Sequence, residues 1–408
     1  MSVAMLVLRV ASLVLSFILL YQLFFAFFAL GKPALPAKGK KNHRFALVIS
    51  ARNEQSVLPM LLDSLNQQHY PRECYDIFVV ADNCTDHTAH VAWDHGAIVY
   101  ERFNREQVGK GYALQWFFRS FLVREEGKYD AVAIFDADNL VDPGYLSAMN
   151  DQLGVGEVAA MGYRDSKNPY DNWVSGGSSM IWWTLSRFYH LPRQRMGLSA
   201  LAGGTGYMFR IDLLADGWNT QTICEDIEFS MQLMAKGHRI AYAPQARFYD
   251  EQPTQLTASI HQRYRWAVGS MQCVKVCMPD LLRAACGPNR SLAADAILYL
   301  GLTPLVGFQL LVSLTSFALN FFLPISMWPA AFGPSIAMWA VGWLLCVGQG
   351  GLLLWLEGKS IRRLWKALLL YPIYLSFSAV INLVTFFYRN PVWRPIAHQK
   401  AVALRQIS

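Results

Sequence analysis

The sequence has few charged residues: only 16 % of its 408 residues are Asp, Glu, Lys or Arg, whereas 53 % are hydrophobic. Soluble globular domains carry about 25 % charged residues, so this composition argues against an ordinary soluble protein. The seven cysteines are scattered, with no Cys-x-x-Cys pair and no His/Cys spacing typical of a metal site. We therefore expect a globular part in the reducing cytoplasm, combined with membrane segments.

Two common nucleotide-binding motifs are also absent. No Gly-x-Gly-x-x-Gly follows the first predicted strand and there is no Walker motif, which argues against dinucleotide oxidoreductases and P-loop enzymes. The net charge is +7, and the basic excess is clustered beside apolar segments. That clustering indicates attraction to anionic lipids and to a diphosphate substrate rather than binding of nucleic acid.

The N-terminal segment is long and apolar. Residues 3–30 contain Arg9 as their only charge, and they exceed the roughly 20 residues needed to span a bilayer. A cluster of basic residues follows at once: Lys32, Lys38, Lys40, Lys41 and Arg44. By the positive-inside rule, segment 1–31 is expected to be a transmembrane helix, and the domain over 32–250 is expected in the cytoplasm.

Three further apolar segments, near 293–323, 333–357 and 366–388, predict three transmembrane helices within 291–390. The loop before the last segment should be cytoplasmic because it carries several cations: Lys359, Arg362, Arg363 and Lys366. Three crossings would place the basic tail, 391–408, on the outer side, against the same rule. Either the charge bias fails there, or one segment is re-entrant or interfacial; three crossings is our expectation.

The stretch from Ala131 to Asp138 organises the globular part. A run of β-type apolar residues ends in Asp136 and Asp138, which predicts a buried central strand whose carboxyl end faces a ligand site. If the extended geometry persists, the two carboxylates point to the same side. Such a pair suits Mg²⁺ or Mn²⁺, which typically carries substrate phosphates. A strand that simply ends in a polar turn is the alternative.

Strand and helix signals alternate through the globular part. Apolar strands at 45–50, 76–81 and 97–100 are separated by helical segments such as 57–68. This alternation predicts an α/β, Rossmann-like fold with a mainly parallel sheet and right-handed crossovers. Because the carboxyl ends of parallel strands share one edge, the polar loops after them are expected to converge.

Several polar residues in these loops could carry chemistry. Asp82 could accept a hydrogen bond from a base, and Lys110, between two glycines at a helix start, could meet a phosphate. Gly203-Gly204-Thr205-Gly206 would let backbone approach a ligand closely. Asp226, at another helix start, could act as a general base. Turn, surface and helix-dipole roles are the alternatives for these residues.

Two later segments combine aromatic and basic residues. Residues 172–195 suit a helix on the membrane surface, an acceptor-lining wall or simple core packing. Within a helical stretch of 251–290, the side chains of Gln262, Arg265 and Trp266 fall on one face. An arginine for a diphosphate and a tryptophan for a sugar ring make this combination more specific than a basic interfacial helix alone.

The ordered set ISARNE, VVADNCTDHT, FDAD, CED and QRYRW resembles the membrane-embedded family 2 glycosyltransferases. These include cellulose, hyaluronan, chitin and poly-N-acetylglucosamine synthases, and the resemblance covers about residues 45–270. It implies a GT-A type catalytic domain that moves a sugar, with inversion, from a UDP-sugar of the UDP-glucose or UDP-N-acetylglucosamine class. The sequence departs from many members at Cys224, where Thr or Gly is common, and at Arg52.

The resemblance also implies roles for individual residues. The uracil and the nucleotide would be bound by Ser50, Asn53, Glu54, Asp82 and Lys110. The metal, Mg²⁺ or Mn²⁺, and the diphosphate would be held by Asp136 and Asp138, with Arg265 on the diphosphate. The base would be Asp226, in a catalytic acidic pair with Glu225. The acceptor would be bound by Gln262, Trp266, Gly204 and Thr205.

Three functions remain open from the sequence. The first is extension of a polysaccharide that is secreted through the membrane helices, with homo-oligomerisation or accessory secretion subunits as options. The second is non-processive transfer of one sugar to a lipid, as in the similar ceramide glucosyltransferases. The third is a non-enzymatic transporter or scaffold, against which the intact set Asp136, Asp138, Asp226 and Arg265 argues. For the protein as a whole we expect the plasma (inner) membrane.

Overall fold

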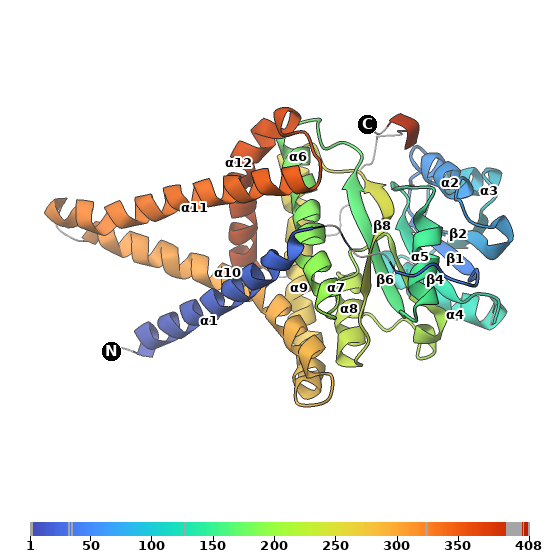
Figure 1. Ribbon diagram of the computed structural model, residues 1–408, viewed down its shortest axis with the longest axis horizontal. Coiled ribbons are helices and arrows are strands. Elements are labelled where there is room, and N and C mark those ends of the chain that lie inside the picture. The colour runs from blue at the N-terminus through green and yellow to red at the C-terminus, as the bar shows by residue number, and fades with distance from the viewer. Residues whose placement is uncertain are drawn as a thin grey trace.

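The computed structural model describes residues 3–31, 33, 36–125, 127–322, 325–388, 402 and 404–406. An α/β domain lies at one end, and long helices extend away from it (Figure 1). Most of the predicted basic tail, including Arg394 and Lys400, lies outside the described residues, as does Lys32 in the N-terminal basic cluster.

The α/β domain is built on one eight-stranded sheet, in the order β3-β2-β1-β4-β7-β6-β8-β5. Its strands are β1 (Phe45–Ala51), β2 (Tyr75–Asp82), β3 (Ile98–Arg102), β4 (Ala131–Asp136), β5 (Leu140–Val141), β6 (Ala159–Ser166), β7 (Tyr207–Arg210) and β8 (Ala241–Asp250). The predicted strands at 45–50, 76–81 and 97–100 are thus confirmed to within two residues. Strand β4 is buried along its apolar run, as expected for a central strand.

The first four strands in the order, β3 to β4, pair in parallel, and so do β6 and β8. In contrast, β7 runs antiparallel to both β4 and β6, and β5 runs antiparallel to β8. Alternation of strand and helix does not hold at β7, because a glycine-containing loop leads directly into it. Gly206 N–H donates to Ile134 O at 2.8 Å, so the chain enters β7 at the carboxyl end of β4 and runs back.

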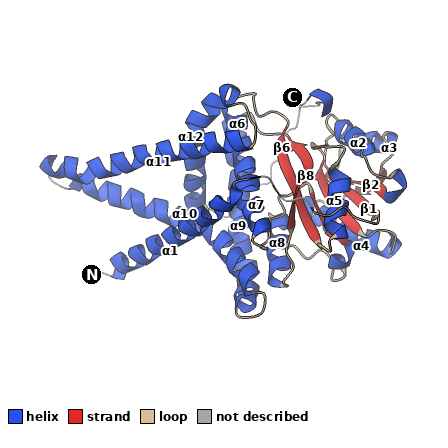
Figure 2. Cartoon of the chain, in the orientation of Figure 1, coloured by secondary structure: helices blue, strands red, loops and turns tan. Residues whose placement is uncertain are grey.

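Helices surround the strands of this domain (Figure 2). They are α2 (Leu58–Asn66), α3 (Thr88–Asp94), α4 (Lys110–Glu125), α5 (Tyr145–Gly154) and α8 (Glu225–Ala235). Helix α4 places Phe117 and Phe121 on Phe78 of β2, with ring centroids 5.5 and 5.4 Å apart. All three rings are fully buried, so aromatic packing fixes this helix against the sheet.

The extended helices are α1 (Val3–Ala26), α10 (Arg290–Leu319), α11 (Trp328–Leu356) and α12 (Ile361–Val384). Three segments among the described residues are long and apolar enough to cross a membrane: Arg290–Thr315, Trp339–Leu356 and Ile361–Val384. They match the apolar segments expected from the sequence, and they indicate that the protein associates with a membrane. A shorter apolar helical stretch among the described residues, Leu13–Ala29, covers the second half of α1 and the 3₁₀ turn that follows it.

A middle layer joins the two parts. It contains α6 (Trp173–Thr184), a π-helical segment (Leu185–His190), α7 (Leu191–Arg195) and α9 (Leu256–Ala285). The idea that residues 172–195 lie on the membrane surface is corrected for Trp183, which is fully buried and donates to Asp165 Oδ1 at 2.9 Å. Core packing, the alternative raised above, describes this side chain.

Ion pairs tie the middle layer and the α/β domain to the extended helices. The Arg193 guanidinium of α7 donates to both oxygens of Asp295 on α10, at 2.8 Å each, and both side chains are at most 1 % exposed. Arg193 also donates to Gln22 Oε1 on α1 at 3.1 Å. Between α11 and α12, Lys359 donates to both oxygens of Asp165 at 2.8 Å.

Candidate active site

A cavity of about 1740 Å³ lies between the carboxyl ends of β1 and β4, the middle layer and the extended helices. Most of the predicted site residues line it: Ser50, Glu54, Asp82, Lys110, Asp136, Asp138, Gly204, Glu225, Asp226, Gln262, Arg265 and Trp266. Segments more than 200 positions apart in the sequence therefore meet at one place. This convergence is what the parallel strand ends predicted.

Two predicted site residues, Asn53 and Thr205, are not among the residues that line the cavity. Each one forms hydrogen bonds that hold a cavity-lining loop in place. Asn53 has a φ of 58° and its Oδ1 accepts the N–H of Thr85 at 2.8 Å, which joins the loops after β1 and β2. Thr205 is fully buried, and its Oγ1 accepts the Asp136 N–H at 2.9 Å and donates to Asn139. Thr205 therefore orients Asp136 from behind.

The donor end of the cavity is organised around Asp136. Parallel pairing sets Ser50 of β1 opposite Asp136 of β4. The Lys110 ammonium forms an ion pair with Asp136 and donates to Gly204 O at 2.6 Å, a contact that needs the positive φ of Gly204, 81°. Burial alone would lower the pKa of Lys110, but the carboxylates led by Asp136 outweigh it and raise the pKa. Lys110 therefore stays charged, as a phosphate ligand requires.

The residues that could hold a metal are Asp136 and Asp138. The strand ends at Asp136 and a turn follows, so the expected extended geometry stops there, yet both side chains reach the cavity. Among the described residues no cluster of three His, Cys, Asp or Glu side chains could hold a metal ion. Two carboxylates fit Mg²⁺ or Mn²⁺ when substrate phosphates supply further oxygens, which is the usual arrangement for Mg²⁺.

The acidic pair lies at the start of α8. Burial raises the pKa of the Glu225 carboxyl to about 8, with the Asp226 charge as a second cause. Burial also raises the pKa of Asp226, while the N–H groups at the helix start and the Lys110 charge act in the opposite direction. Glu225 is thus mainly protonated at neutral pH, and Asp226 is the better candidate for a base.

Opposite this pair, α9 presents Gln262, Arg265 and Trp266 to the cavity on one face, as their spacing predicted. Burial lowers the pKa of Arg265. Within the described part of the chain, its guanidinium forms no hydrogen bond or ion pair. A half-buried guanidinium that faces a cavity without a protein partner suits an anionic ligand such as a diphosphate.

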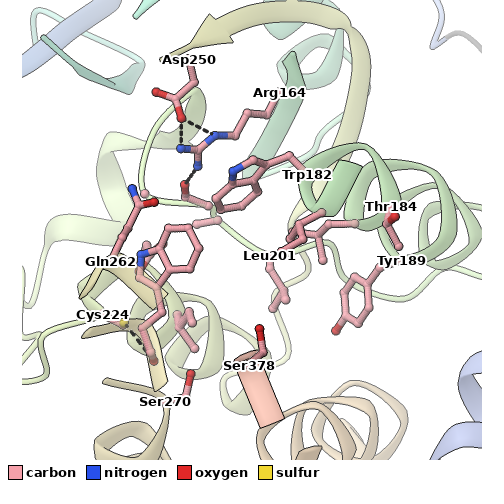
Figure 3. A pocket seen from close by; sticks show the side chains of 18 of the residues that line it. Arg164, Trp182, Thr184, Tyr189, Leu201, Cys224, Asp250, Gln262, Ser270 and Ser378 are labelled. Carbon is pink, nitrogen blue, oxygen red and sulfur yellow. Dashed lines mark hydrogen bonds and ion pairs between the residues drawn. The ribbon is translucent and has the colours of Figure 1, made fainter. Parts of the chain in front are cut away.

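Sequence reasoning missed Arg164 and Asp250, at the ends of β6 and β8. Arg164 Nε–H donates to Asp250 at 3.0 Å, and its guanidinium lies 3.7 Å from the ring centroid of Trp182 (Figure 3). Trp182 in turn lies edge-on to Trp266, with ring centroids 5.3 Å apart. No motif surrounds either charge in the sequence; only their position at strand ends could have indicated them.

The far half of the cavity is apolar and belongs to the extended helices. Its lining includes Leu19 and Leu23 of α1, Leu344 and Leu345 of α11, and Leu375 of α12. Leu19, Leu23, Leu344 and Leu345 are also exposed on the surface of the described chain. The cavity therefore runs from a polar end at the sheet to an apolar end between helices that suit a membrane.

Replacing Thr205 with Val is expected to weaken Mn²⁺-dependent binding of UDP by ~10- to 100-fold, because the loop that carries Asp136 loses the hydroxyl that accepts its main-chain N–H. Isothermal titration of the variant with UDP and Mn²⁺ measures the change. Thr315→Val is the matched control, since Thr315 Oγ1 only donates to Leu311 O within α10. Unchanged binding in Thr205→Val would contradict the orienting role.

Comparison with known proteins gives one family and several relatives. Residues 43–269 match the family described as Glycosyltransferase like family 2. A beta-monoglucosyldiacylglycerol synthase of Nostoc sp. is 28 % identical over 240 residues, which cover 56 % of this chain and 49 % of that protein. Hyaluronan synthase 1 of Xenopus tropicalis is 25 % identical over 149 residues, 34 % of this chain and 25 % of that protein. The chain spans about half or less of the length of these curated relatives.

Among solved structures, mannosyltransferase PcManGT from Pyrobaculum calidifontis, in complex with GDP-Man and Mn²⁺, has the same fold. Its TM-score is 0.61 at 17 % sequence identity, and the match covers 93 % of this chain and 100 % of that one. The expected GT-A type architecture is thereby confirmed. Since the matched region 43–269 spans more than half of the chain and holds the polar end of the cavity, the protein belongs to glycosyltransferase family 2.

Proposed function

We propose that the protein transfers a sugar from a UDP-sugar, with inversion and with a divalent metal, to an acceptor held in the membrane. The observation that supports it best is the single cavity, in which Asp136, Asp138, Asp226 and Arg265 meet and which continues between the extended helices. The domain boundaries expected from the sequence fit this proposal, with catalysis over 32–250 and the Gln-x-x-Arg-Trp helix within 251–290.

The side chains divide the reaction between them. Asp226 takes the proton of the acceptor hydroxyl, whose oxygen attacks the anomeric carbon of the donor sugar from the face opposite the leaving group. The bond to the diphosphate breaks, and Lys110 and Arg265 stabilise the negative charge that the leaving UDP carries. Trp266 and Trp182 offer ring faces for the acceptor sugar or headgroup.

Mg²⁺ or Mn²⁺ would be held by Asp136 and Asp138. When bound, it would neutralise charge on the donor diphosphate. Thr205 holds the main-chain N–H of Asp136, and Lys110 pairs with its carboxylate.

A lipid acceptor is favoured by the apolar half of the cavity. Leucines of α1 and α11 line it and also face the surroundings, so an acyl chain could reach the polar end directly from a bilayer. The name of the Nostoc relative, a glucosyldiacylglycerol synthase, agrees with an acceptor of this class. The single hydroxyl of a diacylglycerol-like lipid would then meet Asp226.

A growing polysaccharide is the second candidate acceptor, and the Trp182–Trp266 pair favours it, because stacked sugars need aromatic faces. Radiolabel transfer separates the two candidates. Purified protein in lipid is incubated with a panel of UDP-sugars and Mn²⁺ or Mg²⁺, with and without diacylglycerol, and the products are sized. One sugar per lipid supports the first candidate, and a long polymer supports the second. Without any product or UDP release, the proposed function fails.

Gly348→Phe on α11 is expected to reduce transfer to a lipid by ~10- to 100-fold, because the new ring fills the apolar half of the cavity and misplaces the acceptor. Gly348 lines the cavity, and a Cβ there meets no atom of the described residues within 4 Å, so the helix itself tolerates the change. Steady-state kinetics should show a raised KM for the lipid and an unchanged KM for the UDP-sugar.

Gly351→Phe is the matched control. Gly351 lies on the same helix with equally open space at its Cβ, but it does not line the cavity. Transfer by this variant should equal that of the unchanged protein. Equal losses in both variants would point to a general effect on α11 and would count against a lipid path beside Gly348.

The transfer rate is expected to fall as the pH is lowered, because protonated Asp226 cannot accept the acceptor's proton. Since burial raises the pKa of Asp226, this acid limb should lie above the usual range of an aspartate. The profile of kcat against pH at saturating substrates measures it. A rate that is flat down to pH 4 would contradict the assignment of Asp226 as a base.

The side of the membrane follows from the cations between α11 and α12. Lys359 contacts Asp165 of the α/β domain, so this basic loop and the domain lie on the same side. The positive-inside rule then supports a cytoplasmic catalytic domain on the plasma (inner) membrane. Homo-oligomers or accessory subunits stay options for the polysaccharide candidate only.

A further inference from the structure

Helix α12 is apolar and 24 residues long, but it does not follow the direction of the other extended helices. Figure 1 shows α10 and α11 extending away from the sheet, whereas α12 lies across them at their base, beside α6 and α9. Length and composition suit a membrane span, yet its neighbours are the helices of the middle layer.

The first half of α12 lies along α6. The Arg363 guanidinium stacks on Tyr170, 3.6 Å from the ring centroid, just before α6 begins. A Cβ on Gly176 would lie 2.6 Å from the Ala367 Cβ, so the two helices touch almost backbone to backbone. One turn further on, Tyr371 hydrogen-bonds Thr184, with 3.3 Å between their oxygens.

The second half of α12 lies along α9. Arg263 donates to Tyr374 O at 2.7 Å and to Ser378 Oγ at 3.0 Å. Beyond the end of the helix, Tyr264 OH donates to Tyr388 O at 2.9 Å. Both ends of α12 are thus fixed to elements that pack on the α/β domain, and neither end reaches the far tip of α10 and α11.

The last described turn, Leu404–Gln406, gives an independent observation. It lies against α2 of the α/β domain, where Leu404 and Arg405 line a small pocket with Met60 and Gln67. Figure 1 shows this end of the chain beside α2, away from the extended helices. The described turn Leu404–Gln406 is therefore found on the side of the catalytic domain.

Helix lengths leave room for this arrangement. The 29 residues of α11 span ~44 Å at 1.5 Å per residue, whereas the hydrocarbon core of a bilayer is ~30 Å thick. The remaining ~14 Å lets its last turns pass through a helix layer at the membrane surface. An exposed apolar stripe runs along α12: Trp365, Leu369, Ile373, Val380 and Val384. Cations cluster at its first turns: Arg362, Arg363 and Lys366.

We propose that α12 lies in the plane of the membrane, at the headgroup boundary of the leaflet on the catalytic side, and does not cross it. Its exposed apolar side chains contact the acyl chains, while Trp365 and the cations of its first turns contact the lipid headgroups. The basic tail then lies on the same side of the membrane as the catalytic domain. The basic tail is then cytoplasmic, as the positive-inside rule requires. The opposite face of α12 lines the active-site cavity through Tyr371, Leu375 and Ser378, so the docked leaflet forms the support of one cavity wall.

Sided labelling tests the position of the tail. The partly or fully exposed cysteines, Cys74, Cys84, Cys286 and Cys346, are first replaced by Ser. In this background Gln406→Cys and Ser326→Cys are made separately, and Glu101→Cys marks the catalytic domain. All three positions are exposed. Sealed vesicles of known orientation are treated with a membrane-impermeant maleimide. Gln406→Cys should label from the same side as Glu101→Cys, and Ser326→Cys from the other side. Labelling of Gln406→Cys together with Ser326→Cys would show that α12 crosses and would overturn the proposal.

Depth measurements test the helix itself and do not depend on the tail or on activity. Nitroxides are placed at Trp365→Cys, Ile373→Cys and Val384→Cys, and collisions with oxygen and with a polar nickel complex report depth. An in-plane helix gives three similar, shallow depths. A crossing helix separates the outer two positions by ~29 Å along the membrane normal, with the middle one deepest. That second pattern would contradict the proposal.

Discussion

Asp226→Asn is expected to reduce sugar transfer by ~100- to 10,000-fold while UDP binding with Mn²⁺ is retained. The amide keeps the shape of the half-buried side chain at the start of α8, but it cannot take a proton from the acceptor hydroxyl. Radiolabel transfer and isothermal titration of the same preparation separate the two effects. Asp216→Asn, at an 82 % exposed side chain, is the matched control and should leave both quantities unchanged.

Glu225→Gln provides the sharper comparison, because it alters the neighbouring carboxyl. Since burial and the Asp226 charge raise the pKa of Glu225 to about 8, its protonated form predominates at neutral pH, and glutamine resembles that form. We therefore expect a much smaller loss of transfer than in Asp226→Asn. The reverse order of the two losses would assign the base to Glu225.

Arg193→Met is expected to lower the free energy of unfolding by ~3–5 kcal/mol, because the buried Asp295 carboxylate loses its cation and keeps the Tyr21 hydroxyl as a donor. The loss should appear as a lower midpoint of thermal unfolding in detergent. It should also weaken the attachment of α10, which limited proteolysis between the α/β domain and the extended helices would report.

The double variant Arg193→Met with Asp295→Leu removes both charges and should recover much of this loss. Arg283→Met with Asp280→Leu is the control, because this pair is exposed on α9 and contributes little. A double variant as unstable as Arg193→Met alone would show that packing, rather than the unpaired charge, causes the loss.

The parts of the site that the sequence predicted share one property: each is a short motif at a place fixed by chain direction. Asp136 follows an apolar strand, and Arg265 and Trp266 are spaced for one helix face. The local sequence pattern was therefore enough to predict that these residues line one cavity. For Asn53 and Thr205, the sequence predicted correctly that their loops border the site. Each side chain, however, is directed to a neighbouring loop, which depends on the backbone angles.

The residues that sequence reasoning missed depend on tertiary pairing. Arg164 and Asp250 are 86 positions apart, and nothing near either one indicates its partner. The direction of β7 depends on where a loop re-enters the sheet, and a four-residue strand carries no signal for it. Likewise, hydropathy reports the length of α12 but not the direction in which it lies.

The Arg193–Asp295 pair also has a consequence for the order of assembly. The two residues are 102 positions apart, so at ~5–20 residues per second Arg193 is made ~5–20 s before Asp295. During that interval the Arg193 guanidinium cannot form its ion pair with the Asp295 carboxylate. The middle layer therefore reaches its final packing around α7 only after the first part of α10 has been synthesised. In a fragment cut before α10, Arg193 would lack the Asp295 carboxylate permanently, and its guanidinium would have to be hydrated by water instead.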